Sequence, residues 1–115
     1  MAKPEREFFA VAEVEWTPAM GGLVAGLFER VLASDPESGV ASRMLRFDPG
    51  TDTRAAGPQI HAFWEEVYIL EGALHDLTLD RTFAAGTYAC RPPGMAHGPW
   101  IAPQGCLTFE VRYAP

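Results

Sequence analysis

Apolar and polar residues alternate along several short stretches of the chain, the pattern of strands that expose two different faces. The clearest case spans residues 106–113, where four apolar residues share one face: Leu107, Phe109, Val111 and Tyr113. The opposite face carries Thr108, Glu110 and Arg112. This stretch predicts a half-buried strand of an antiparallel sheet, with its apolar face toward a core.

Two N-terminal stretches are apolar as well. Residues 8–16 end in an alternation of Ala12, Val14 and Trp16 with two glutamates, and Pro18 stops the run, so we expect the first strand at about 8–16. Residues 23–32 fit a helical i, i+4 spacing and also an apolar strand. We favour the strand.

Further strand-like runs follow, and turn residues separate them. They cover residues 40–47, 66–70, 73–79 and 87–90. Eleven glycines and ten prolines are scattered along the 115 residues, which is typical of many short strands joined by turns. We therefore expect an all-β domain, a sandwich or barrel, as a single domain over residues 1–115.

The charge balance excludes several classes of partner. Nine Lys and Arg against fifteen Asp and Glu give a net charge of −6, the wrong sign for nucleic acid or an anionic membrane. We find no apolar run near the ~18–20 residues of a membrane span and expect a cytoplasmic protein. Cys90 and Cys106 lack a metal-binding or disulfide spacing, so we expect reduced thiols without a catalytic role.

Candidate chemistry concentrates in residues 57–72 and 86–100. If the first stretch is extended, Gln59, His61 and Glu65 share parity and point to the same side. His97 follows a Pro-Pro-Gly turn that reverses the chain and can bring it beside them. Two histidines and one carboxylate with open positions suit non-haem Fe(II), and also Mn, Ni, Co or Zn.

The first of these stretches resembles the first motif of the cupin superfamily, G-x5-H-x-H-x3,4-E-x6-G. The match runs through His61, three residues, Glu65, six residues and Gly72. Gln59 stands where the motif has its earlier histidine.

The second stretch resembles the second cupin motif, G-x5-P-x-G-x2-H-x3-N. It is met at Gly86, Pro92, Gly94 and His97, and Ile101 stands at the position of the final Asn. Two motifs in the right order and separation are far more specific than an isolated His-x-x-x-Glu. The likeness is greatest to small single-domain cupins of the ChrR-like kind.

This resemblance implies a cupin double-stranded β-helix, a jelly-roll barrel, over about residues 40–113. It implies that His61, Glu65 and His97 bind one divalent metal ion per chain, with Gln59 as a candidate fourth ligand. It also implies a homodimer, for which the apolar segment 8–16 offers an edge.

Aromatic, apolar and cationic residues near these ligands are candidates for a substrate pocket: Phe63, Tyr68, Tyr88, Arg91, Met95 and Trp100. Two hypotheses follow. The chain is a metal-dependent enzyme, dioxygenase-like or related, acting on a small oxygenated organic molecule. Alternatively, it is a non-catalytic ChrR-like module that binds a small ligand or senses a metal. The fold alone does not separate them.

Overall fold

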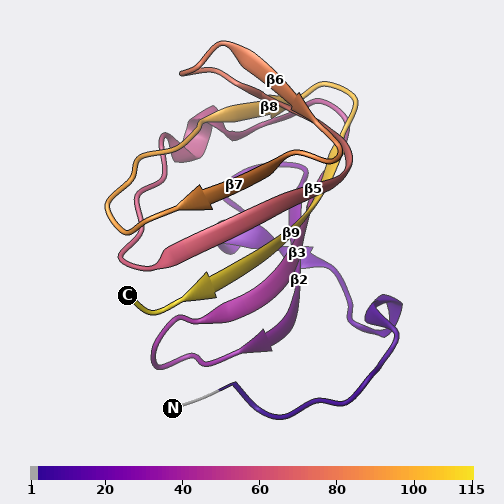
Figure 1. The fold of residues 1–115 in the computed structure, drawn as a ribbon. Coiled ribbons are helices and arrows are strands. Elements are labelled where there is room, and N and C mark those ends of the chain that lie inside the picture. The colour runs from indigo at the N-terminus through magenta and orange to yellow at the C-terminus, as the bar shows by residue number, and fades with distance from the viewer. Residues whose placement is uncertain (1–2) are drawn as a thin grey trace.

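The computed structural model describes residues 3–115, in which nine strands form two antiparallel sheets that curl into a barrel (Figure 1). In chain order the elements are η1 (Val11–Glu13), β1 (Thr17–Pro18), η2 (Ala19–Gly22), β2 (Leu27–Ser34), β3 (Ala41–Phe47), β4 (Thr51–Asp52), η3 (Thr53–Ala56), β5 (Trp64–Asp76), β6 (Arg81–Ala84), β7 (Tyr88–Arg91), β8 (Trp100–Ala102) and β9 (Cys106–Tyr113), where η denotes a 3-10 helix. The all-β jelly-roll prediction is confirmed.

The long strand β5 belongs to both sheets. One sheet has the order β1-β2-β3-β9-β5-β7, and the other has the order β4-β8-β5-β6. β5 turns from one to the other at a register shift between Ile69 and Glu71, followed by Gly72 with a φ of 74°. A Cβ at Gly72 would meet the carbonyl oxygen of Gly105, so only glycine fits this corner.

Inward-facing side chains change from apolar to charged along each of four adjacent strands. At one end of the barrel, Leu27, Phe47, Cys106 and Ile69 belong to the buried apolar core. Further along the same strands, the interior holds Glu29, Arg43, Glu110 and Glu65. Apolar packing therefore stabilises one end of the barrel, and charged side chains line the interior of the other end.

The prediction of a first strand at residues 8–16 is wrong. This segment is irregular apart from η1 and runs along the outside of the barrel (Figure 1). Side chains hold it, since Arg30 Nε donates to the Val14 carbonyl at 2.6 Å and the Arg30 guanidinium lies 4.2 Å from the Trp16 ring centre. The Arg30 guanidinium makes both contacts, so a side chain holds this segment in place and pairing with a strand is not needed.

The remaining strand predictions agree with the structure to different degrees. Residues 23–26 precede β2, so the predicted strand 23–32 begins four residues too early. The run 66–70 and most of the run 73–79 belong to one strand, β5, which ends at Asp76, so the second prediction extends three residues too far into a turn. The predicted strands 40–47, 87–90 and 106–113 correspond to β3, β7 and β9.

The predicted orientation of β9 is also wrong. Thr108 and Glu110 are buried inside the barrel, whereas Leu107 and Phe109 on the opposite face are only partly buried. The polar face points into the barrel because the interior at this end contains ionic partners for it. No helix among the described residues is long and apolar enough to cross a membrane.

Candidate metal centre

The two motif regions are held together by backbone pairing. Gln59 and His97 form an antiparallel bridge, with Gln59 N donating to His97 O at 2.7 Å and His97 N donating to Gln59 O at 2.9 Å. Gly94 N also donates to the carbonyl of His61 at 2.8 Å. The loop between β7 and β8 therefore brings His97 next to the segment that enters β5, as the sequence predicts.

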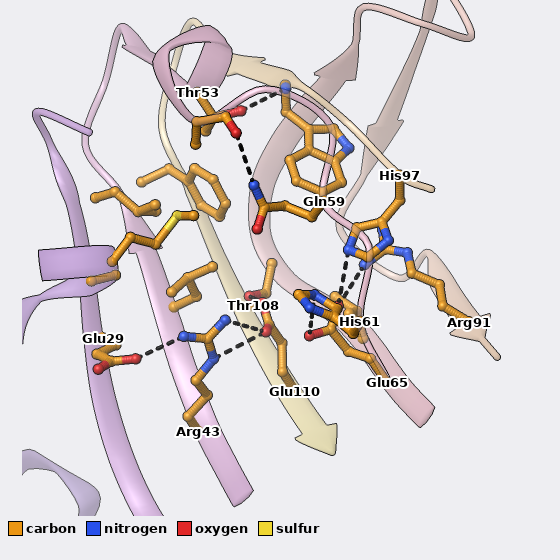
Figure 2. A pocket seen from close by; sticks show the side chains of 18 of the residues that line it. Glu29, Arg43, Thr53, Gln59, His61, Glu65, Arg91, His97, Thr108 and Glu110 are labelled. Carbon is orange, nitrogen blue, oxygen red and sulfur yellow. Dashed lines mark hydrogen bonds and ion pairs between the residues drawn. The ribbon is translucent and has the colours of Figure 1, made fainter. Parts of the chain in front are cut away.

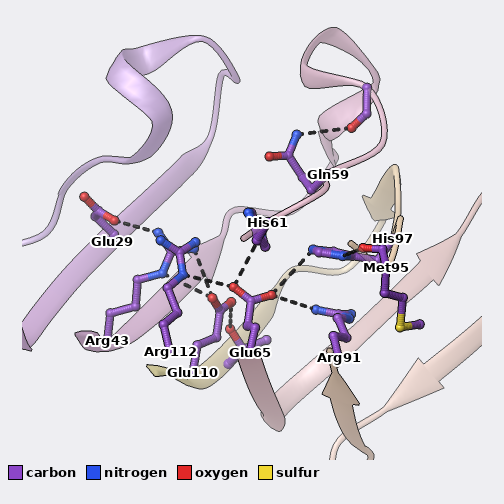
Figure 3. Close-up of polar contacts among 12 residues, drawn as sticks. Glu29, Arg43, Gln59, His61, Glu65, Arg91, Met95, His97, Glu110 and Arg112 are labelled. Atoms are coloured by element: carbon purple, nitrogen blue, oxygen red, sulfur yellow. Dashed lines mark hydrogen bonds and ion pairs between the residues drawn. The ribbon is translucent and has the colours of Figure 1, made fainter. Parts of the chain in front are cut away.

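His61, Glu65 and His97 converge on one point (Figure 3). One ligand atom from each residue lies within 4.8 Å of the others. His97 Nε2 lies 3.5 Å from Glu65 Oε1, and His61 Nε2 lies 3.7 Å from Glu65 Oε2. All three groups border the same cavity, of about 390 Å³.

Both histidines are held in the neutral form that binds metals. Burial and the charge of Arg91 lower the pKa of His97 to about 4. Burial also lowers the pKa of His61, assisted by Arg112 and opposed by Glu65. His97 Nδ1 lies 3.2 Å from the Met95 carbonyl, to which it must donate, so its Nε2 carries the lone pair that faces Glu65.

Glu65 accepts from two arginines, one on each side. Arg91 Nη1 lies 3.0 Å from Oε1 and Arg112 Nε lies 3.0 Å from Oε2. The three residues are direct cross-strand neighbours on β7, β5 and β9. Burial opposes the ionisation of Glu65, but Arg112 and Arg91 outweigh it and keep its pKa below the ordinary value. The carboxylate is therefore charged and fixed in position.

Gln59 lines the same cavity, and its amide is oriented by the backbone. Its Nε2 donates to the carbonyls of Ala56 and Gly57 at 3.2 and 3.3 Å. Figure 2 shows the amide oxygen on the other side, toward the cavity. Two neutral imidazoles, one carboxylate and an amide oxygen form a donor set that fits a divalent transition metal.

The predicted pocket residues divide among three places. Phe63 lines the cavity of the metal centre, and its ring stacks on His61 with centroids 4.5 Å apart. Arg91 and Trp100 line this cavity and also a second one, of about 340 Å³, to which Tyr88 and Met95 belong. Tyr68 lines neither, since it alternates with inward-facing Val67 and points outward, 45% exposed.

An ionic cluster of Glu29, Arg43 and Glu110 was missed by the sequence analysis (Figure 2). Arg43 donates from Nε and Nη2 to Glu110 Oε1 at 3.1 and 3.0 Å, and from Nη1 to Glu29 Oε2 at 2.7 Å. Thr108 Oγ1 also donates to Glu110, at 3.1 Å. The alternation in β9 could have indicated this cluster, because it places two charged residues, Glu110 and Arg112, on one face of the strand.

Comparison with known proteins identifies related folds. A family model described as the ChrR Cupin-like domain matches residues 4–114. No curated protein matches the sequence. An RmlC-like cupin from Shewanella frigidimarina NCIMB 400 is 22% identical, with a TM-score of 0.73 over 97% of this chain and 93% of that one.

Two further solved structures share this fold. An acetylacetone dioxygenase from Acinetobacter johnsonii is 17% identical, with a TM-score of 0.74 over 97% of this chain and 76% of that one. The anti-sigma protein ChrR of Rhodobacter sphaeroides, solved in complex with SigE, is 21% identical, with a TM-score of 0.65 over 90% of this chain and 51% of that one. At these identities the likeness concerns the fold alone.

Proposed function

Because this chain belongs to the ChrR cupin-like domain family, we propose that it is a metal-binding cupin that acts on a small oxygenated organic molecule. The observation that carries the proposal is the convergence of His61, Glu65 and His97 beside a cavity of about 390 Å³. We assign these three residues as ligands of one divalent ion, with Gln59 as a fourth through its amide oxygen.

A divalent ion at this position supplies Lewis acidity toward a carbonyl or enol oxygen. The residues around it have separate roles. Arg91 and Arg112 hold the Glu65 carboxylate in place, and the Met95 carbonyl holds the His97 ring. Phe63 and Trp100 form apolar walls beside the histidines and limit the access of water to the site.

The reaction we favour is dioxygenase-like cleavage of a small diketone or phenol. The two-histidine, one-carboxylate donor set with open positions supports it, because this set serves non-haem Fe(II) oxygen chemistry. An acetylacetone dioxygenase among the proteins of like fold is consistent with it.

The test is elemental analysis of the purified protein beside His97→Ala and Glu65→Gln, followed by oxygen-electrode assays of the iron-loaded form. We expect close to one ion per chain in the wild type and a large loss in both variants, with oxygen uptake that depends on added diketone or phenol. Circular dichroism shows whether each variant is folded. A folded wild type without metal after reconstitution contradicts the proposal.

A non-catalytic sensor is the second candidate. Membership in a family named for ChrR favours it, since a ChrR structure contains a sigma factor as partner. The replacement of a motif histidine by Gln59 also favours a site that binds without turnover. Stoichiometric metal without oxygen uptake or substrate conversion would support the sensor.

We also propose that the chain forms a homodimer through the outer face of the sheet that contains β9. Met44 and Phe109 are cross-strand neighbours there, and Tyr68 and Leu70 on β5 are 45% and 41% exposed. Burying such apolar groups favours association. Light scattering in solution should give about twice the 12.6 kDa chain mass, and a mass of one chain contradicts the dimer.

A further inference from the structure

A second cavity of about 340 Å³ lies next to the metal centre, and its lining is mainly apolar. It is lined by residues of β5, β6, β7 and β8, by Pro58 and by the segments that follow β5 and β7. The two cavities share five wall residues: Val67, Leu74, Arg91, His97 and Trp100. A molecule in the second cavity would therefore end beside a proposed metal ligand, His97.

Two large apolar side chains line this cavity and remain exposed. They are Leu79 and Met95, which are 60% and 45% exposed. Tyr88 also borders the cavity, but its hydroxyl donates to Glu66 on the outer face of the sheet. Exposed apolar groups at the edge of a concave, mainly apolar cavity are typical of a ligand-binding site.

Hydrogen bonds join the two segments that border the opening, the turn after β5 and the loop after β7. Asp76 Oδ1 accepts from the backbone N–H groups of Thr78 and Leu79, both at 2.9 Å. Thr78 Oγ1 donates to the Gly98 carbonyl at 2.8 Å, and Leu77 N donates to the Pro99 carbonyl at 3.0 Å. The turn that carries Leu79 is thus fixed to the loop that carries Met95, and the cavity is preformed.

Arg91 supplies the charge at the inner end. Within the described chain, its guanidinium makes one hydrogen bond, from Nη1 to Glu65, and it lies 5.3 Å from the Trp100 ring centre. A guanidinium has five N–H donors, so most of its donors remain for a ligand.

Arg91 shares its carboxylate partner with a second arginine. Arg91 and Arg112 share the single carboxylate of Glu65, while Arg43 is paired separately with Glu110 and Glu29. Asp76 carries the one carboxylate among the described residues that line the second cavity, and it accepts from the turn backbone. The remaining donors of Arg91 therefore let the inner end of the cavity accept a carboxylate.

From this arrangement we propose that the second cavity binds an amphipathic monocarboxylate, with its carboxylate at Arg91 and its apolar body between Val67, Ile69, Leu74 and the rim. The inference rests on the small-molecule part of the proposed function and names the class of ligand. The carbon next to the carboxylate then lies at the wall that the two cavities share.

The test uses the folded protein after removal of metal with a chelator, so that it does not depend on metal binding. Calorimetric titrations with butanoate, hexanoate and octanoate should show affinity rising about three- to fourfold for each added methylene, the value of ~0.8 kcal/mol per buried CH₂. Octanol, which has the same body without the charge, should bind at least about tenfold more weakly than octanoate.

Two variants test the binding of the ligand's carboxylate and of its apolar body separately. Arg91→Gln should weaken octanoate at least about tenfold and leave octanol unchanged. Ala89→Phe, which fills the cavity from β7, should weaken both ligands, while metal binding measured by chelator competition stays as in the wild type. Thermal unfolding verifies that both variants are folded.

Equal binding of octanoate and octanol would overturn the inference, as would affinity independent of chain length. Carboxylate binding in a protein that never binds metal would support the inference and contradict the proposed metal centre. The two proposals can thus fail separately.

Discussion

Gln59 and His97 lie opposite each other on paired backbones, so the side chain at position 59 emerges beside a proposed metal ligand. The Gln59 amide occupies the position that a histidine holds in the first cupin motif. This pairing links the two motifs directly, although they are 38 residues apart along the chain.

We expect Gln59→His to raise affinity for Zn²⁺ or Ni²⁺ by at least about tenfold, or ~1.4 kcal/mol, because imidazole is a stronger transition-metal ligand than an amide oxygen. Competition with a chromophoric chelator measures the change. Gln59→Leu serves as the matched control and should weaken binding slightly. Equal affinities of all three proteins would mean that position 59 does not reach the ion.

Arg43→Met should lower the free energy of unfolding by about 3–5 kcal/mol, because it leaves the buried Glu110 carboxylate without its cation. Urea denaturation measures this loss. The double variant with Glu110→Met should recover most of the stability, since it removes the second buried charge. A double variant as unstable as the single one would show that the loss arises from packing.

Gly72→Ala should destabilise the protein more than Gly86→Ala does. Both glycines have a positive φ, 74° and 89°, and an alanine there costs about 1–2 kcal/mol. Only at Gly72 does the new Cβ meet backbone, the Gly105 carbonyl, whereas at Gly86 the space is open. Thermal unfolding of the two variants gives the comparison, and equal losses would contradict the proposed role of Gly72 at the β5 corner.

The two cysteines should react differently with thiol reagents. Cys90 is exposed on β7, whereas Cys106 is buried, and burial raises the pKa of the Cys106 thiol to about 12. Ellman's reagent at pH 8 should therefore titrate one thiol per folded chain and two after denaturation. Cys90→Ser should reduce the folded value to none.

The Cys106 thiol makes the free energy of unfolding depend on pH in alkaline solution. The folded state keeps a proton on Cys106 that the unfolded state releases above its ordinary pKa of 9.0. Its contribution is complete below about pH 9 and is lost toward pH 12, by up to ~1.4 kcal/mol per pH unit. Urea titrations of the wild type and Cys106→Ala at pH 8 and pH 10 measure this contribution, and parallel losses in both would contradict it.

Motif spacing was sufficient to predict the three convergent donors. The parity of His61 and Glu65 and the turn before His97 carry that information locally. Once the barrel closes, the backbones of residues 59 and 97 pair and place His97 beside the other two donors. The arginines on Glu65 depend on strand register, which alternation within a single strand does not reveal.

The faces of β9 were misassigned for a related reason. Alternation shows that Leu107 and Thr108 lie on different faces, but not which face is inside. In this barrel the interior contains Arg43, so Glu110 gains an ionic partner by pointing inward. The N-terminal alternation around Trp16 misled us as well, since contacts with Arg30 hold that segment in place of a partner strand.

The position of β9 between β3 and β5 affects how the protein folds during synthesis. β9 is the last of these strands to emerge from the ribosome, yet it must insert between two strands made much earlier. Such distant pairing is slow, and until it forms, the edges of β3 and β5 are open to other chains. Glu110 and Arg112 arrive with β9, so Arg43 and Glu65 gain these ionic partners only after β9 has paired.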